Sequence, residues 1–168
     1  MNRFSIRSDQ VNGETVYFVA GSIENEQQFE RISAENRPKV VVDLKDVSFI
    51  SSNGIRSFFK WLGKFPEGCQ VTFRNIPYVI ARQIGSLQEF LPQDYYIESI
   101  AVPYICVECD GAEDVIFRDG VEFRSAQAAG GPAVIGRELT CPNCGKPMEM
   151  DVVASSYFWF LKPARNAS

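Results

Sequence analysis

Hydrophobic residues in the first hundred positions form strand-like runs separated by segments with helical spacing. Residues 4–21 predict two strands around Asn12-Gly13, a dipeptide that readily accepts positive φ in a hairpin. Residues 39–44, with the sequence KVVVDL, form a nearly continuous β-branched run, which is typical of a central strand covered on both faces. Two further strands are predicted at residues 71–75 and 95–102.

The clearest helical pattern follows the polar turn FISSNG at residues 49–54. Apolar residues recur there at i, i+3, i+4 and i+7, the core-facing stripe of an amphipathic helix, at Ile55, Phe58, Phe59 and Leu62. Residues 76–91 predict a second helix, because Pro77 suits a first turn and one side is apolar. Strands that alternate with single helices over residues 1–102 predict an α/β domain with a central sheet.

A weaker helical signal lies between the first strands and the valine-rich run. The spacing of Ile23, Phe29 and Ile32 suggests a short, mostly polar helix. We expect it to end before Arg37-Pro38, because the residue before a proline disfavours the helical region.

The pattern changes after Pro103, where short β-like pieces surround a turn at Asp119-Gly120. Residues 125–136 are rich in small residues, as in a loop or a flexible insertion. We therefore expect a second, smaller and β-rich domain over residues 103–168.

The composition indicates a folded protein that lacks histidine, the usual general base. Hydrophobic residues make up 45% of the 168 positions, enough for a real core, and the formal net charge of −4 argues against a broad nucleic-acid-binding face. The chain has no histidine, no P-loop motif and no clustered carboxylate pair, so no enzyme activity is expected. Its first residues lack a signal peptide and no apolar run is long enough to span a membrane, so we expect a cytoplasmic protein.

Four of the five cysteines form two CxxC pairs about thirty residues apart, Cys106 with Cys109 and Cys141 with Cys144. This spacing is typical of a zinc site, in which two tight turns direct four thiolates toward one tetrahedral ion. The region resembles a zinc ribbon, and Gly145 supplies the backbone freedom that the second turn needs. Disulfide or redox use of the pairs, and a ribbon without metal, are the alternatives.

Charge and size indicate what the cysteine region does. Residues 103–168 carry six Lys or Arg against nine Asp or Glu, a net charge of about −3, which disfavours nucleic acid as a partner. A segment of this size could hardly build a sufficient core alone, and zinc would supply on the order of 10–16 kcal/mol of coupled binding and folding. Four protein ligands would leave no open position for catalysis, so the expected role of zinc is structural.

For two other features we expect a structural role rather than a functional one. Cys69 stands alone before a strand and is more often a small buried hydrophobe than a reactive thiol. The aromatic run YFWFL at residues 157–161 is expected to pack the tail onto neighbouring structure, with an exposed partner patch as the alternative.

The order of elements, the valine-rich strand and the Ser/Asn/Gly turn before an amphipathic helix together resemble the STAS family of bacterial anti-sigma factor antagonists. The resemblance covers roughly residues 3–102 and implies a layered, mixed β-sheet with amphipathic helices. In that family the turn reads Asp-Ser-Ser-Gly, and a partner kinase that doubles as an anti-sigma factor phosphorylates the first serine. Aligned on Gly54, that serine is Ser52, while Ser51 stands in place of the aspartate and Asn53 in place of the second serine.

Two interpretations of this turn stay open. Its polar side chains could simply cap the helix, because a serine or asparagine oxygen accepts hydrogen bonds from the first backbone N–H groups. Alternatively, Ser52 or Ser51 is a phosphorylation site. A phosphate there would gain only about 0.3–1 kcal/mol from the helix dipole, whereas its burial against a partner would cost several kcal/mol unless paired. Phosphorylation would therefore act on binding rather than on folding.

The helix after the turn supplies candidate partner-binding residues, since arginine and tryptophan are enriched at binding hot spots. The candidates are Asn53, Gly54, Arg56, Lys60, Trp61 and Lys64. A solvated face without a partner is the alternative.

The leading hypothesis is a non-enzymatic regulatory module, switched by phosphorylation at Ser52. The resemblance implies an anti-sigma factor or a serine kinase as its partner. A constitutive adaptor or scaffold in a bacterial signalling or transcription assembly is the second hypothesis. The oligomeric state, including a homo-oligomer, stays open.

Overall fold

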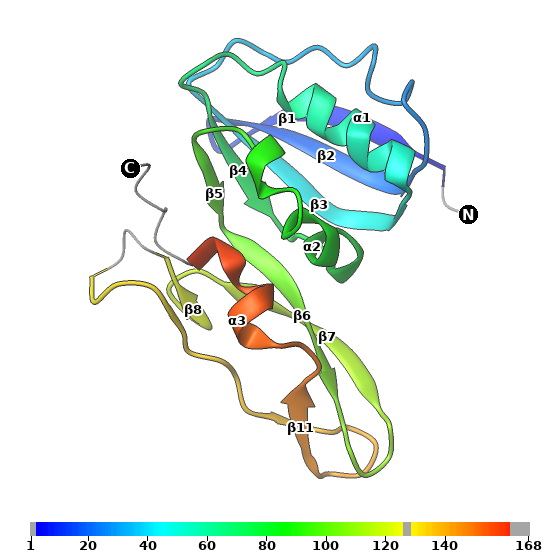
Figure 1. Cartoon of the computed structure of the whole chain (residues 1–168), viewed down its shortest axis with the longest axis vertical. Coiled ribbons are helices and arrows are strands. Elements are labelled where there is room, and N and C mark those ends of the chain that lie inside the picture. The colour runs from blue at the N-terminus through cyan, green and yellow to red at the C-terminus, as the bar shows by residue number, and fades with distance from the viewer. Residues whose placement is uncertain (1–2, 126–128, 162–168) are drawn as a thin grey trace. The chain divides into compact units, whose positions relative to one another are not determined.

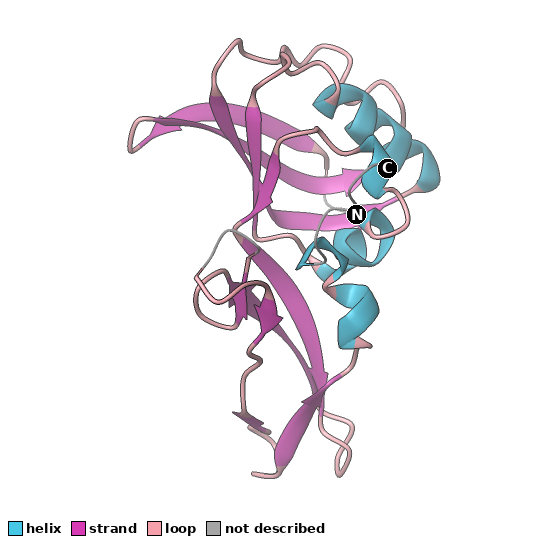
Figure 2. Cartoon of the chain, turned by 60° about the vertical axis from the view of Figure 1, so that its left-hand side comes forward, coloured by secondary structure: helices cyan, strands magenta, loops and turns pink. Residues whose placement is uncertain are grey.

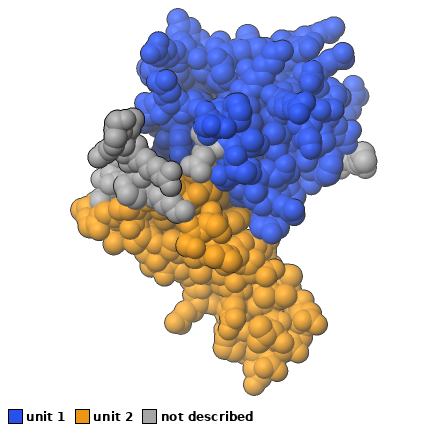
Figure 3. All heavy atoms as spheres, in the orientation of Figure 1, with its two compact units in different colours: residues 1–98 blue, residues 99–168 orange. Residues whose placement is uncertain are grey.

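The computed structural model describes residues 3–125 and 129–161. The chain separates into two compact units, residues 1–98 and residues 99–168 (Figure 3). The boundary expected from the sequence lay four residues later, at residue 102.

The first unit is built on a mixed five-stranded sheet with the order β1-β2-β3-β4-β5 (Figure 1). Its strands are β1 (Ser5–Val11), β2 (Glu14–Ile23), β3 (Lys39–Ile50), β4 (Gln70–Arg74) and β5 (Tyr95–Ile97). β1 and β2 are antiparallel, and the neighbours from β2 to β5 are parallel. Asn12 and Gly13 connect β1 to β2 with φ of 51° and 82°, as the hairpin prediction required. The predicted α/β class with a mixed sheet is therefore confirmed.

The valine-rich run lies in the middle of this sheet. Four residues of β3 are completely buried, Val40, Val41, Val42 and Leu44. β3 pairs with β2 on one side and with β4 on the other. The prediction of a central strand covered on both faces is confirmed.

Two helices follow strands of the first unit, α1 (Ser52–Leu62) and α2 (Tyr78–Ile84). Figure 2 shows both on the same face of the five-stranded sheet. α1 buries Phe58, Phe59 and Leu62, three of the four apolar positions that the sequence predicted, so its amphipathic pattern is confirmed. None of the helices in the described part of the chain is long and apolar enough to cross a membrane.

The short polar helix predicted from Ile23, Phe29 and Ile32 is wrong. β2 continues to Ile23, and the segment that follows forms turns rather than a helix. The side-chain oxygen of Gln28 accepts hydrogen bonds from the backbone N–H groups of Glu24, at 2.7 Å, and Asn25, at 3.2 Å. A side chain therefore satisfies donors at the start of this segment, and the backbone does not need a helix to do so.

The predicted helix at residues 76–91 is shorter in the structure. α2 ends at Ile84, and a 3₁₀ turn, η1 (Gln88–Phe90), follows after Gly85. Pro77 lies at the N-cap rather than inside the first turn. Glycine and serine after Ile84 have poor helix propensity, which explains the early end.

The strand predicted at residues 95–102 is divided between the two units. β5 ends at Ile97, and β6 (Ser99–Ile105) belongs to the sheet of the second unit. Glu98 lies between them, and its carboxylate accepts two hydrogen bonds from the guanidinium of Arg74, at 2.7 and 3.0 Å. Its backbone N–H also donates to the carbonyl of Phe73 at 2.9 Å, so several bonds hold the end of β5 at this point.

The second unit is β-rich, as predicted. Its antiparallel sheet has the order β10-β11-β6-β7, with β7 (Ala112–Arg118), β10 (Leu139–Thr140) and β11 (Pro147–Met150). A second pair consists of β8 (Phe123–Arg124) and β9 (Ala133–Val134). β9 lies within the segment expected to be a flexible insertion, of which residues 126–128 fall outside the described residues.

The aromatic run near the C-terminus packs into the second unit. It forms α3 (Ala154–Tyr157) and η2 (Trp159–Leu161). Tyr157, Phe158 and Trp159 are buried, and the ring of Phe158 stacks on Phe117 with 5.9 Å between centroids. The packing role predicted for this run is confirmed.

Candidate metal centre and partner surface

The structure brings the four CxxC cysteines together in the second unit. The Sγ atoms of Cys106, Cys109, Cys141 and Cys144 all lie within 4.8 Å of one another. The four predicted metal ligands therefore form one cluster.

Each CxxC pair lies on a tight turn, here called a knuckle, between two antiparallel strands. The first knuckle joins β6 to β7, and the N–H of Asp110 donates to the carbonyl of Cys106 at 2.9 Å. The second joins β10 to β11, and the N–H of Gly145 donates to the carbonyl of Cys141, also at 2.9 Å. Both donor residues have left-handed φ, 56° at Asp110 and 71° at Gly145. Sequence reasoning identified Gly145 but missed Asp110, although aspartate is one of the few residues that adopt this conformation.

The distances between sulfur atoms fit a tetrahedral metal ion. Cys106 and Cys144 are 3.4 Å apart and Cys109 and Cys141 are 3.5 Å apart. A Zn–S length of 2.3 Å places two tetrahedral ligands roughly 3.8 Å apart. A disulfide needs about 2.0 Å, and all five cysteines are free thiols here. The cluster therefore suits a shared ion better than a covalent bond.

The thiols influence one another electrostatically. Backbone N–H groups of Asn143 and Cys144 lower the pKa of Cys141 to about 7. At Cys109 the N–H of Gly111 acts to lower the pKa, but hydrogen bonds with Cys141 and Cys144 outweigh it and raise the pKa to about 12. At Cys144 the N–H of Lys146 acts to lower the pKa, but the contacts with Cys106 and Cys141 and the desolvation by burial together outweigh it and raise the pKa. Of these three thiols Cys141 ionises most readily, and a cation beside the cluster would oppose the raised pKa values of Cys109 and Cys144.

Gly111 leaves room beside the cluster, a feature that sequence reasoning missed. A Cβ atom at this position would lie 3.0 Å from the Asn143 Nδ2 and 3.2 Å from the Cys141 Sγ. Both distances are tighter than ordinary van der Waals contact, so a larger residue would press on the sulfur. The dipeptide Asp110-Gly111 directly after the first pair was the available signal.

The second candidate site is the start of α1. Ser51 is the N-cap: its Oγ accepts a hydrogen bond from the N–H of Gly54 at 3.0 Å and donates one to the carbonyl of Glu24 at 2.6 Å. Ser52, the next residue, is exposed, and its hydroxyl makes no hydrogen bond to any described residue. Ser51 therefore completes the cap by itself, and Ser52 is not needed for it.

The start of α1 is fixed on the end of β2 and the loop after it. A Cβ on Gly54 would lie 2.1 Å from the carbonyl oxygen of Ile23, so only glycine allows this approach. The Ser51 N–H donates to the same oxygen at 2.8 Å, and the Ser57 hydroxyl donates to the carbonyl of Glu26 at 2.9 Å. Gly54 is buried here, so its expected place on a partner surface is wrong.

Two other predicted surface residues have structural roles. Trp61 has no exposed area and packs against Tyr17 and Phe29, with ring centroids 5.3 and 5.2 Å away. It belongs to the core, so its predicted place on the surface is wrong. The ammonium group of Lys64 is exposed but donates to the carbonyls of Phe29, at 3.4 Å, and Glu30, at 3.3 Å. The candidates that are exposed and have no side-chain hydrogen bond or ion pair to another described residue are Asn53, Arg56 and Lys60.

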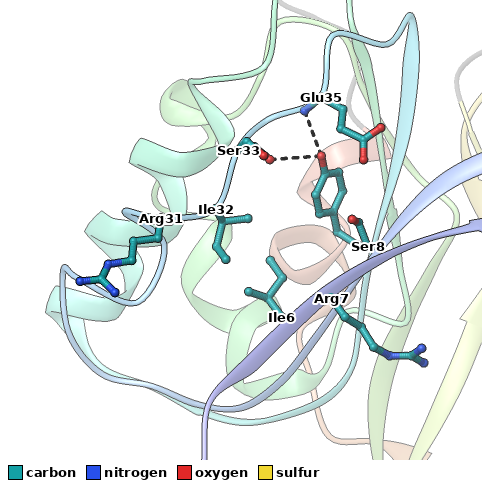
Figure 4. Close-up of a pocket in the computed structure, with 8 residues that line it drawn as sticks. Ile6, Arg7, Ser8, Arg31, Ile32, Ser33 and Glu35 are labelled. Atoms are coloured by element: carbon teal, nitrogen blue, oxygen red, sulfur yellow. Dashed lines mark hydrogen bonds between the residues drawn. The ribbon is translucent and has the colours of Figure 1, made fainter.

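A small hollow of about 180 Å³ lies elsewhere in the first unit, around the Tyr17 hydroxyl (Figure 4). That hydroxyl donates to the carbonyl of Ser33 and accepts from the N–H of Glu35, and desolvation by burial raises its pKa. The guanidinium groups of Arg7 and Arg31 point in opposite directions. The two guanidinium groups therefore do not converge on one ligand, and the Tyr17 hydroxyl is already bonded within the protein.

No family model matches this chain, and no curated protein matches it. Among solved structures, an anti-sigma factor antagonist from Mycobacterium paratuberculosis is similar, with 24% identity and a TM-score of 0.42. The match covers 56% of this chain and 86% of the antagonist. An uncharacterised protein with a SpoIIAA-like fold from Shewanella loihica is similar over 58% of this chain and 86% of its own, with 11% identity and a TM-score of 0.39.

Proposed function

We propose that this chain is a non-enzymatic, cytoplasmic regulatory protein whose first unit binds a protein partner at the start of α1. The observation that carries the proposal is the contrast between Ser51, which is fully bonded as the helix cap, and Ser52, which is exposed and unbonded among the described residues. The helix is held in place without Ser52, so that hydroxyl is available to a second protein. The resemblance to STAS proteins suggests an anti-sigma factor or a serine kinase as the partner.

The proposed partner surface consists of Ser52, Asn53, Arg56 and Lys60, which are all exposed. Arg56 and Lys60 form no ion pair within the described part of the chain. They lie four residues apart on one side of α1 and can therefore act together on a partner. Their charge favours a partner that presents acidic side chains there.

Phosphorylation of Ser52 is the proposed switch. It would add roughly −1.5 to −2 charges at one end of this basic surface and so cancel most or all of the two positive charges of Arg56 and Lys60. The hydrogen bonds from Ser51 and Ser57 to the loop after β2 hold the helix independently of Ser52. The added charge would therefore change binding while the fold stays the same.

The test is a pull-down from a lysate of the source organism with wild type, Ser52→Ala and Ser52→Asp. We expect wild type and Ser52→Ala to capture the same partner, Ser52→Asp to lose it, and the lysate kinase to modify Ser52 in a phosphopeptide map. Ser48→Ala and Ser48→Asp are matched controls, because Ser48 is an exposed serine of the preceding strand. Equal capture by Ser52→Asp and wild type, with no phosphate on Ser52, would contradict the switch.

That contradicting result would favour the second candidate, a constitutive adaptor with no phosphoswitch. The completed cap at Ser51 supports this alternative, because the turn has a structural function without any modification. Under this hypothesis, Arg56→Glu should still abolish partner capture, since the surface is the same.

We also propose that the second unit holds one zinc ion at the four cysteines in a structural role. The support is the clustering of four free thiols at distances that suit a tetrahedral ion. Metal analysis of protein purified under reducing conditions should find one zinc per chain. Cys106→Ser should lose it, while Cys69→Ser, at the buried cysteine outside the cluster, should retain it. Substoichiometric metal in both wild type and Cys69→Ser would contradict this role.

A further inference from the structure

We propose that the four-cysteine cluster is a peroxide-sensitive switch, in which oxidation joins the two knuckles by disulfides and releases the metal ion. This inference rests on the proposed zinc site. It adds a specific pairing, Cys109 with Cys141 and Cys106 with Cys144.

The two cysteines of each knuckle differ in exposure. Cys106 and Cys141, the first of each pair, are buried, with 0% and 1% of their surface exposed. Cys109 and Cys144, the second of each pair, are exposed. An oxidant from solvent therefore reaches one sulfur on each knuckle and not the other.

The close contacts between thiols connect an exposed sulfur with a buried one on the opposite knuckle. Cys109 lies 3.5 Å from Cys141, and Cys144 lies 3.4 Å from Cys106. Redox-sensing cysteines are accessible and have a second, resolving cysteine beside them. Each accessible thiol of this cluster has such a neighbour.

The chemistry proceeds in two balanced steps on each pair. The exposed sulfur, a thiolate while it is bound to the ion, attacks hydrogen peroxide: the O–O bond breaks, the sulfur is oxidised to a sulfenic acid, and hydroxide leaves and takes a proton from solvent to give water. The buried thiolate then attacks the sulfenic sulfur, the S–O bond breaks, and a second hydroxide leaves and is protonated to water as the disulfide forms. Two peroxide molecules oxidise both pairs and remove all four thiolates from the metal, which departs as the divalent ion.

The same oxidation would replace one connection between the knuckles by another. The ion joins the β6–β7 knuckle to the β10–β11 knuckle through its ligands. Disulfides that cross between the knuckles maintain this connection, whereas disulfides within each CxxC pair would sever it. The pairing therefore decides whether the oxidised unit keeps its two halves together.

The test uses the full chain in its Cys69→Ser form, so that only the four clustered cysteines can react. Metal content is measured first, then hydrogen peroxide is added and zinc release is followed with a metallochromic dye. Trypsin under non-reducing conditions cuts after Arg82, Arg118, Arg137 and Arg165, which places both cysteines of the first pair in residues 83–118 and both of the second in residues 138–165. Additional cleavage after Glu108 separates Cys106 from Cys109, and backbone fragmentation between Cys141 and Cys144 in tandem mass spectrometry shows which of these two cysteines each half is bonded to.

We expect release of one zinc for two peroxide molecules, and peptides 83–118 and 138–165 joined by both proposed bonds. Unlinked peptides with a disulfide inside each CxxC pair, the opposite cross-pairing, or thiols that stay reduced would each overturn the inference. If no zinc is found before oxidation, only the proposed zinc site is contradicted. The disulfide map of the metal-free protein would then still decide the pairing.

Discussion

At the scale of single residues, neighbouring positions at the start of α1 have different tasks. Ser51 bonds in two directions and fixes the helix start to the carbonyl of Glu24. Gly54 allows the helix backbone to approach Ile23. Ser52, between them, has neither task, which is why it is the candidate for regulation.

The close approach at Gly54 leads to the first prediction. Gly54→Ala should lower the free energy of unfolding by about 1–3 kcal/mol or more, because its Cβ would overlap the Ile23 carbonyl, which is backbone and cannot rotate away. Urea unfolding checks this. Gly63→Ala, at the end of the same helix, is the control: its φ is −67° and its Cβ would meet neighbours at 3.6 Å, so it should be neutral or stabilising by about 0.4–1 kcal/mol. Equal losses in both variants would contradict the argument.

A second prediction separates the two adjacent serines. Ser51→Ala should cost about 1 kcal/mol of stability, because it removes the N-cap and leaves the Glu24 carbonyl without its donor. Ser52→Ala should stay within about 0.5 kcal/mol of wild type, as is usual for an exposed residue without partners. Thermal unfolding of the two variants gives the comparison. The reverse order of stability would show that Ser52 is the true cap.

At the scale of elements, the two knuckles repeat one local design on two hairpins. In each, the residue after the second cysteine adopts a left-handed conformation and donates its N–H to the carbonyl of the first cysteine. The turn thereby positions two thiols on one side. The cluster then needs only that the β6–β7 and β10–β11 hairpins belong to the same sheet, which the pairing of β11 with β6 ensures.

A pH dependence of metal binding follows from the thiols. The pKa values of Cys109 and Cys144 are raised, so both are protonated at neutral pH without metal, and binding must displace their protons. Each displaced proton contributes about a factor of ten per pH unit, so these two protons alone should make zinc affinity fall by about a hundredfold or more per unit as pH decreases toward 7. The fall should steepen below pH 7, where Cys141 also becomes protonated. Competition with a zinc chelator between pH 8 and 6 measures the slope, and affinity independent of pH would contradict thiolate ligation.

At the scale of the whole molecule, the chain contains two units with separate sheets and cores. The first has a central strand with four completely buried apolar residues and two helices on the sheet. The second has a narrow sheet, short strands and an aromatic C-terminal segment. Only the second contains the cysteine cluster, so metal should matter to one unit and not to the other.

Each unit contains one buried tryptophan, Trp61 in the first and Trp159 in the second, which makes this difference measurable. In Trp61→Phe, treatment with a strong chelator should shift Trp159 fluorescence to the red, because the proposed zinc ion would supply much of the stability of the second unit. In Trp159→Phe, the spectrum of Trp61 should be unchanged, since its aromatic neighbours belong to the first unit. A red shift of both tryptophans would show that the first unit also depends on the metal.

Features that depend on neighbours in sequence could be predicted from the sequence alone. The Asn12-Gly13 hairpin, the amphipathic α1 and the buried β3 follow from local conformational preference and spacing. The geometry of each cysteine pair could also be predicted locally, because the CxxC spacing by itself directs two thiols to one side of a turn.

Features that depend on distant partners were decided by the tertiary structure. Trp61 could be taken for a surface residue because its burial depends on Tyr17 and Phe29, which reach it from β2 and from the loop after it. The strand predicted at residues 95–102 breaks at Glu98 because β5 pairs within the first sheet and β6 within the second. Arg74, which belongs to another strand, binds the Glu98 carboxylate at this point. Helical spacing and strand propensity show which face of an element is apolar. Contacts between residues distant in sequence determine which part of the chain covers that face.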